Sequence, residues 1–360
     1  MRAQMRVTIA LGIFVFCCAV EARAFPIPPV SLLELCRCAD AIAVGKVVKP
    51  VEFMDSESDG VAEVRVTRVY KGDAKVGDLV RVTGIEPGMI CPAPPCYPAN
   101  ATGIAFLRKN VETDGYTTVG LSYGSKFVRN EKDPLANHPW SLTLEDLRDI
   151  EAATAEYIKI EQLADPEEKK RATIDWLVGL TEHPATARSG CQELCDSAWS
   201  YTVKQFAASK FAGDLTDAHK ARLAANVMRW NDVESVLPFG LLLQDYESEL
   251  VTRKLVSALE RGGSKSDVVL LMKLIAKRER RPFVGDVIKR SERVVDYDFL
   301  KSKEGAGLLR EFAQLYADLP ELKPAEGADP RAKSNASKPT SRPAAPGFQK
   351  RYPRRRGAAR

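Results

Sequence analysis

The sequence predicts an α+β chain of two domains, a small antiparallel β-barrel followed by an α-helical domain. From residue 41 to about residue 130, short apolar segments alternate with a period of two and are separated by turn signals. That pattern is typical of half-buried strands. After about residue 141 the apolar residues recur at helical spacing instead, which predicts helices with short connections between them.

Five or six strands are expected in the first half. Residues 61–70 (VAEVRVTRVY) show the clearest alternation, with β-branched residues on one face. No helical segment separates the strands, which favours an antiparallel barrel. The expected strands are residues 41–54, 61–70, 79–84, 103–109 and 116–122, with 125–129 as a further candidate.

The second half, residues 141–320, predicts eight or so helices. Asp165, Pro166 and two glutamates form a strong helix start, with an N-cap and a proline at the first helical position. No fixed sequence period is visible, so an α-helical bundle and a HEAT-like array of two-helix repeats both fit. The expected helices are residues 144–163, 166–180, 189–210, 216–230, 233–245, 247–262, 265–280, 283–294 and 305–318.

The first 24 residues have the plan of a secretory signal peptide. Two arginines precede an apolar run over residues 7–20, and Ala22-Arg23-Ala24 offers a cleavage site. We expect a mature chain that begins at or near Phe25 and is secreted or periplasmic, with a retained anchor as the alternative. No later segment is apolar enough to cross a membrane. Residues 25–35 are rich in proline and are expected to be extended.

The C-terminal residues 321–360 form a basic tail. Residues 331–360 carry ten basic side chains and no acidic one, while the whole chain has a net charge of +5, so residues 1–330 carry a net charge of −5. The tail lacks the apolar residues that would offset the entropy of ordering, so we expect disorder. It is either a solubilising tail or a contact with an anionic polymer or membrane surface. The candidate contacts are Lys350, Arg351, Arg354, Arg355, Arg356 and Arg360.

Six cysteines remain after signal cleavage. An even number in an exported chain favours disulfides over catalytic thiols. No histidine lies beside a cysteine pair, so we expect no metal, and no motif implies a cofactor. Cys191 and Cys195 are spaced by one helical turn, so they form either a strained disulfide, which export favours, or two reduced buried thiols. The other four are Cys36, Cys38, Cys91 and Cys96.

The β region resembles a netrin-like domain, in the group that includes the tissue inhibitors of metalloproteinases. The resemblance is carried by Cys-x-Cys at residues 36–38, AIAVGKVV, VRVTRVYKG followed by VGDLVRV, and two cysteines before GIAFLRK. It covers about residues 36–130 and implies an OB-type barrel over residues 36–140. It also implies that Cys36 and Cys38 are each joined to the loop that holds Cys91 and Cys96.

A rival pairing, Cys91 with Cys96, would leave the first two cysteines as neighbours with poor bonding geometry. In the metalloproteinase inhibitors the first cysteine is the mature N-terminus, whose amine binds the zinc of the protease. Residues 25–35 precede Cys36 here, so we do not expect that inhibitory mechanism.

One motif suggests catalysis. GLSYG at residues 120–124 matches G-x-S-x-G, with Ser122 as the nucleophile, but the residues that follow do not predict a helix. We therefore expect a bend between two strands and a non-enzymatic binding protein, with a protein or an envelope component as partner. The alternatives are a serine hydrolase that uses Ser122 and an envelope-associated structural protein that contacts anionic surfaces through its tail.

Overall fold

A computed structural model describes residues 30–51, 60–85, 95–133, 136, 141–195, 211, 213–279, 284–295 and 299–320. The expected signal peptide and basic tail lie outside these residues. Among the helices that are described, none combines the length and the apolar character needed to cross a bilayer.

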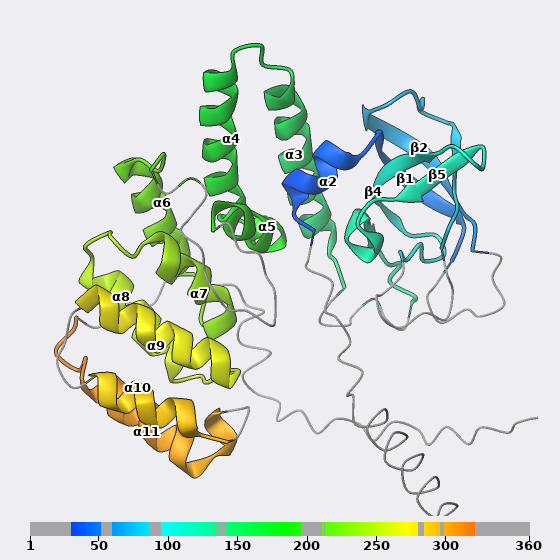
Figure 1. Ribbon diagram of the computed structural model, residues 1–360. Helices are drawn as coiled ribbons and strands as arrows, with labels where there is room; N and C mark the ends of the chain where they lie inside the picture. Colours follow the sequence, from blue (N-terminus) through cyan, green and yellow to red (C-terminus); the bar gives the residue numbers. More distant parts are fainter. Residues whose placement is uncertain are drawn as a thin grey trace, which may run out of the picture.

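The first half of the chain is a closed β-barrel, as the sequence predicts (Figure 1). Strands β1, β2, β3, β5 and β4 are neighbours in that order, and pairing of β4 with β1 closes the ring. β3 and β5 run parallel, the other pairs are antiparallel, and β6 pairs with β4 outside the ring. This arrangement fits an OB-type barrel. The strands are β1 (Ala41–Lys49), β2 (Ala62–Lys71), β3 (Leu79–Val82), β4 (Thr102–Asn110), β5 (Gly115–Thr118) and β6 (Ser125–Val128).

The second half is helical, also as predicted. Helix α4 begins where expected, because the side chain of Asp165 accepts a hydrogen bond from the backbone N–H of Glu167 and Pro166 follows it. Helices α3, α5, α7 and α9 form one row of successive contacts, and α4, α6 and α8 form a second. The helices are α3 (Leu144–Glu161), α4 (Pro166–Leu180), α5 (Pro184–Leu194), α6 (Asp217–Val227), α7 (Val233–Leu242), α8 (Glu249–Leu259), α9 (Lys265–Glu279), α10 (Val284–Arg293) and α11 (Lys303–Gln314).

The segment ahead of the barrel differs from the expectation. Residues 25–35 were predicted to be extended, but helix α2 (Leu32–Cys38) begins within them. Ser31 is its N-cap, and its hydroxyl accepts a hydrogen bond from the backbone N–H of Glu34 at 3.1 Å. The spacing Ser-x-x-Glu is a helix-start signal that outweighs the prolines upstream.

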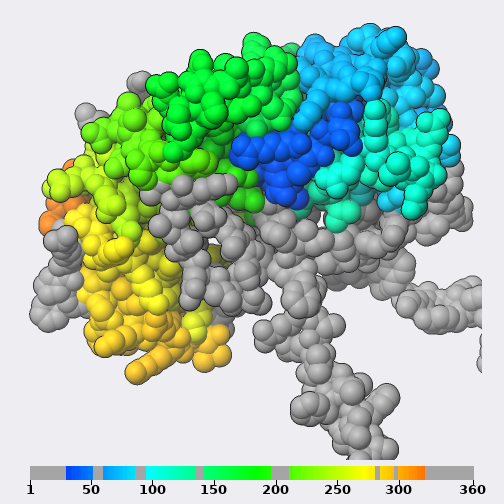
Figure 2. Space-filling model, turned by 45° about the horizontal axis from the view of Figure 1, so that its top comes forward, coloured from blue at the N-terminus to red at the C-terminus, as the bar shows by residue number. Residues whose placement is uncertain are grey.

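The first half of β1 and the middle of β4 are buried on both faces, and this joins the two halves of the protein. Their cross-strand pair Ala43 and Ala105 points into the barrel. The next pairs, Ile42 with Phe106 and Val44 with Ile104, point outward and pack against the helices. In Figure 2, α2 fills the seam between the barrel and the helices that follow it. One apolar cluster therefore runs from the outer face of the barrel through α2 to α11.

Polar contacts hold α2 in this seam. The Nε of Arg37 donates to the hydroxyl of Tyr157 on α3 at 2.8 Å. At the other end of α2, the backbone N–H of Leu32 donates to the hydroxyl of Ser189 on α5 at 3.2 Å. Helix α2 thus contacts the barrel, α3 and α5 at once.

The shared core predicts that damage to the barrel is felt by the helices. Phe106→Ala removes a fully buried ring from the seam and should lower the free energy of unfolding by about 3–5 kcal/mol. The tryptophans all lie between residues 140 and 230, so tryptophan fluorescence reports on the helical half. We expect the urea midpoint of that signal to fall. Val111→Ala, at a fully exposed side chain of the barrel, is the control. An unchanged fluorescence midpoint in the Phe106 variant would contradict a shared core.

Candidate interaction surface

The helices leave one part of the barrel's outer face exposed, which is formed by the second half of β1, the first half of β2 and β3. The pairing register places Lys46 of β1 opposite Arg65 of β2, and Arg65 opposite Leu79 of β3. One step along the strands, Arg81 of β3 lies opposite Glu63 of β2. We call the exposed side chains of this surface the cationic face; they are Lys46, Val48, Arg65, Leu79 and Arg81.

The pair Lys46 and Arg65 is the most informative feature of the cationic face. Residues directly opposite in an antiparallel sheet lie on the same face, so two positive charges stand side by side. Within the described part of the chain, Lys46, Arg65 and Arg81 form no ion pair that would offset this repulsion. Like charges in this position are destabilising, so the pair works against folding.

A β-bulge shapes the same surface. The register shifts between Val47 and Lys49, which leaves Val48 as an extra residue on β1. Val48 is 51 % exposed and Leu79 is 48 % exposed, so two aliphatic side chains stand among the cations. The cationic face therefore combines positive charge with apolar contact area.

A second exposed surface lies in the helical half, at the connection between α7 and α8. An open cleft of about 840 Å³ is lined there by residues 244–249 and by Lys277, Arg278 and Glu279 at the end of α9, so its wall holds two cations beside its carboxylates. Asp245, Glu247 and Glu249 are exposed, and within the described residues none of them forms an ion pair. Leu250, next to them, is 48 % exposed. We call the cleft and its three exposed carboxylates the acidic cleft, with Leu250 at its edge.

The connection that carries the acidic cleft is fixed from below by Arg278 of α9. Its guanidinium donates to the backbone carbonyls of Leu243, Tyr246 and Ser248, the last at 3.1 Å. The side chain is only 5 % exposed, and burial lowers the pKa of the guanidinium. A single side chain thus donates hydrogen bonds to three backbone carbonyls of one loop. These hydrogen bonds fix the conformation of the loop.

Ser122 does not lie in a nucleophile elbow. Residues Leu121–Gly124 form a short 3₁₀ turn, η1, that leads into strand β6 rather than into a helix. A nucleophile elbow needs a strand, a sharp turn and a helix, so that the helix N-terminus faces the substrate. The two described histidines lie beside aspartates of the helical half rather than beside Ser122. His183 lies 3.5 Å from Asp149 and His219 lies 2.6 Å from Asp175.

The predicted staple of the barrel is not formed by Cys96. Cys36 and Cys38 lie on α2, just ahead of the start of β1, and neither forms a disulfide with another described cysteine. Cys96 lies beside the opposite end of β1, because its neighbour Tyr97 pairs with Val51. A disulfide needs Cα atoms within about 7 Å, so Cys96 is not placed to bridge either cysteine of α2.

The remaining partner in that prediction, Cys91, lies outside the described residues, so its pairing stays a prediction. Cys36 is fully buried, and burial is the main reason that its pKa is raised to about 12. A thiol with so high a pKa is a poor nucleophile and behaves as an apolar core residue.

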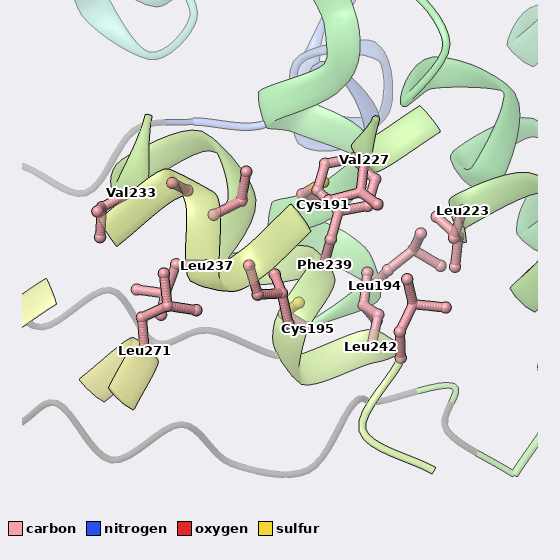
Figure 3. Packing of buried hydrophobic residues seen from close by; sticks show 14 of the residues in the cluster. Cys191, Leu194, Cys195, Leu223, Val227, Val233, Leu237, Phe239, Leu242 and Leu271 are labelled. Atoms are coloured by element: carbon pink, nitrogen blue, oxygen red, sulfur yellow. The ribbon is translucent and has the colours of Figure 1, made fainter. Parts of the chain in front are cut away.

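Cys191 lies in α5 and Cys195 is the C-cap of that helix. Both are buried thiols, which is the reduced alternative that the sequence left open. Figure 3 shows them among apolar side chains of α5, α6 and α7. Burial raises the pKa of Cys191 to about 12 and that of Cys195 in the same direction. The thiol of Cys195 contacts the carbonyl oxygen of Pro238 at 3.5 Å. Their position indicates a packing role.

Comparison with known proteins assigns no family. No protein-family model matches the chain, and no curated protein and no solved structure matches it. The described residues also contain no group of three or more side chains placed to hold a metal ion. The six basic residues predicted to contact anionic surfaces, 350–360, lie outside the described residues. The cationic face was not recognised from the sequence, because it depends on the strand register.

Lys126 of β6 is a charged side chain with an unusual environment. Its ammonium lies 5.7 Å from the centroid of the Tyr123 ring. Its pKa is lowered to about 8, mainly because burial disfavours the charged form and also because Arg188 repels it. No carboxylate of the described residues pairs with it.

This lysine predicts a specific pH dependence. The native state loses the proton near pH 8, whereas the unfolded chain keeps it until about pH 10.4. Between these values the unfolded state binds more protons, so the contribution of Lys126 to stability rises with pH. Lys126→Met should therefore raise the unfolding midpoint at pH 7, and the gain should shrink between pH 8 and about pH 10.4. A gain that does not vary over this range would contradict the lowered pKa.

The geometry of Ser122 predicts that it is not a nucleophile. A fluorophosphonate probe should not label the folded protein, because no helix N-terminus follows the turn to stabilise an oxyanion. Mass spectrometry of the treated protein measures this directly. Labelling that disappears in Ser122→Ala would overturn the assignment.

Proposed function

We propose that the protein is a non-enzymatic binding protein in which the cationic face is the contact surface. The observation that carries this is the pair of like charges, Lys46 and Arg65, on adjacent strands. A folded protein gains nothing from this pair, and local features that work against stability are expected at functional sites. Carboxylates of a partner would remove the repulsion and form charge-assisted hydrogen bonds with both side chains.

The composition of the surface supports the same proposal. Arginine is enriched in protein interfaces, because its planar guanidinium binds carboxylates in a bidentate manner. The exposed Val48 and Leu79 add apolar area beside the charges. None of the five side chains is aromatic, so the stacking platforms that bind nucleic-acid bases are lacking on this surface.

The helices supply the scaffold in this proposal. We propose a HEAT-like array for them, and their two rows of successive contacts support it, because each unit of such an array packs on its neighbours. Export through the signal peptide at residues 1–24 belongs to the same proposal and would place the binding surface outside the cytoplasm.

The proposal predicts that stability and binding are opposed at Lys46. Lys46→Glu turns a like-charge pair into an opposite-charge pair and should raise the free energy of unfolding by about 0.2–1 kcal/mol at low salt. Lys132→Glu makes the same charge change at an exposed lysine of the turn after β6 and is the matched control. Urea unfolding followed by circular dichroism measures both. A loss of stability in the Lys46 variant, or no difference from the control, would remove the observation on which the proposal rests.

A further inference from the structure

We infer that the partner of the cationic face is the acidic cleft of a second copy of this chain. The inference rests on the proposed function, because it names the partner of the same surface. It predicts that copies of the protein associate head to tail.

The two surfaces carry matched groups. The cationic face offers three cations, Lys46, Arg65 and Arg81. The acidic cleft offers three exposed carboxylates, Asp245, Glu247 and Glu249, against one exposed cation of its wall, Lys277. Each surface also has a half-exposed leucine, with Leu79 at 48 % and Leu250 at 48 %. Two surfaces of opposite charge attract each other, and apolar side chains on both add contact area. Two copies of the same surface repel each other, because their charges are alike.

Shape supports the same pairing. The cationic face is the outside of a closed barrel and is therefore convex. The acidic cleft is a hollow of about 840 Å³. A convex surface that enters a hollow can bring its charges close to those of the walls, where water screens them less.

The acidic cleft is ordered before any partner arrives. Arg278 fixes the backbone of the connection through the carbonyls of Leu243, Tyr246 and Ser248. A preorganised surface loses less conformational entropy on binding than a mobile loop does. The strands of the barrel are ordered in the same sense, so neither surface has to fold on contact.

The two surfaces cannot meet within one chain. The barrel lies at one end of the molecule and helices α8 and α9 lie at the other (Figure 1). The contact therefore needs a second copy and joins two different patches. Such a heterologous contact uses a different patch on each copy, so each added copy can bind another. It therefore builds open chains, or rings where the last copy meets the first, rather than a twofold dimer.

Sedimentation velocity of the full chain tests the inference. Association should be strong at about 0.01 M salt and lost at about 1 M salt, where the Debye length falls to about 3 Å. Arg65→Glu/Arg81→Glu reverses the cationic face, and Asp245→Arg/Glu247→Arg reverses the acidic cleft. Each double variant alone should sediment as a monomer, because like charges then meet and weaken association by more than about tenfold. Circular dichroism confirms that both are folded.

The mixture of the two double variants is the decisive arm. One variant keeps an intact acidic cleft and the other keeps an intact cationic face, so an equimolar mixture should form a complex that neither forms alone. A mixture that stays monomeric overturns the inference. In that case a stabilising Lys46→Glu would still support the cationic face as a contact surface, which separates this failure from failure of the proposed function.

A tail variant excludes the competing occupant of the acidic cleft. The full chain in which the six basic residues of 350–360 are replaced by glutamine should associate as the unchanged chain does. Loss of association in this variant would assign the acidic cleft to the tail and overturn the inference. Lys132→Glu, with its charge change away from both surfaces, should have no effect.

Discussion

The packing of the outer face of β1 and β4 against α2 and α3 is the interaction on which the rest of the structure depends. The barrel interior is filled largely by alanine and valine, and so small a core stabilises a domain poorly by itself. Ile42, Val44, Ile104 and Phe106 extend that core outward into the helices. This contact also decides which side of the barrel remains free. With the first half of β1 and the middle of β4 covered, the second half of β1, the first half of β2 and β3 are left to meet other molecules.

Much of the fold could be predicted from the sequence, because local signals and the fold agree. The alternation in residues 61–70 gave β2, and the N-cap at Asp165 gave the start of α4. The joining of the two halves was missed for a physical reason. AIAVG and GIAFL are continuous apolar runs, which is the pattern of strands buried on both faces. They were interpreted only as strands of a separate barrel.

The candidate surfaces were not predictable in the same way. Lys46 and Arg65 lie nineteen positions apart, and they become neighbours only because the bulge at Val48 sets the register of β1 and β2. A one-residue slip would place them on different faces. The shape of the acidic connection likewise depends on Arg278, whose three carbonyl partners lie 30 to 35 residues earlier in the chain. The start of α2 was missed because the prolines of residues 25–35 predict an extended segment, whereas Ser31 starts a helix there.

The position of α2 has a consequence for the order in which the chain can fold. The helix precedes the barrel in sequence, yet the hydroxyl that receives the N–H of Leu32 belongs to Ser189, 157 residues later. Contacts of such long range slow folding, since a long loop must close before they form. Until α3 and α5 are made, Leu33, Leu35 and the outward face of β1 have no permanent cover. During synthesis the amino-terminal third of the protein is therefore the part most exposed to aggregation and most in need of a chaperone.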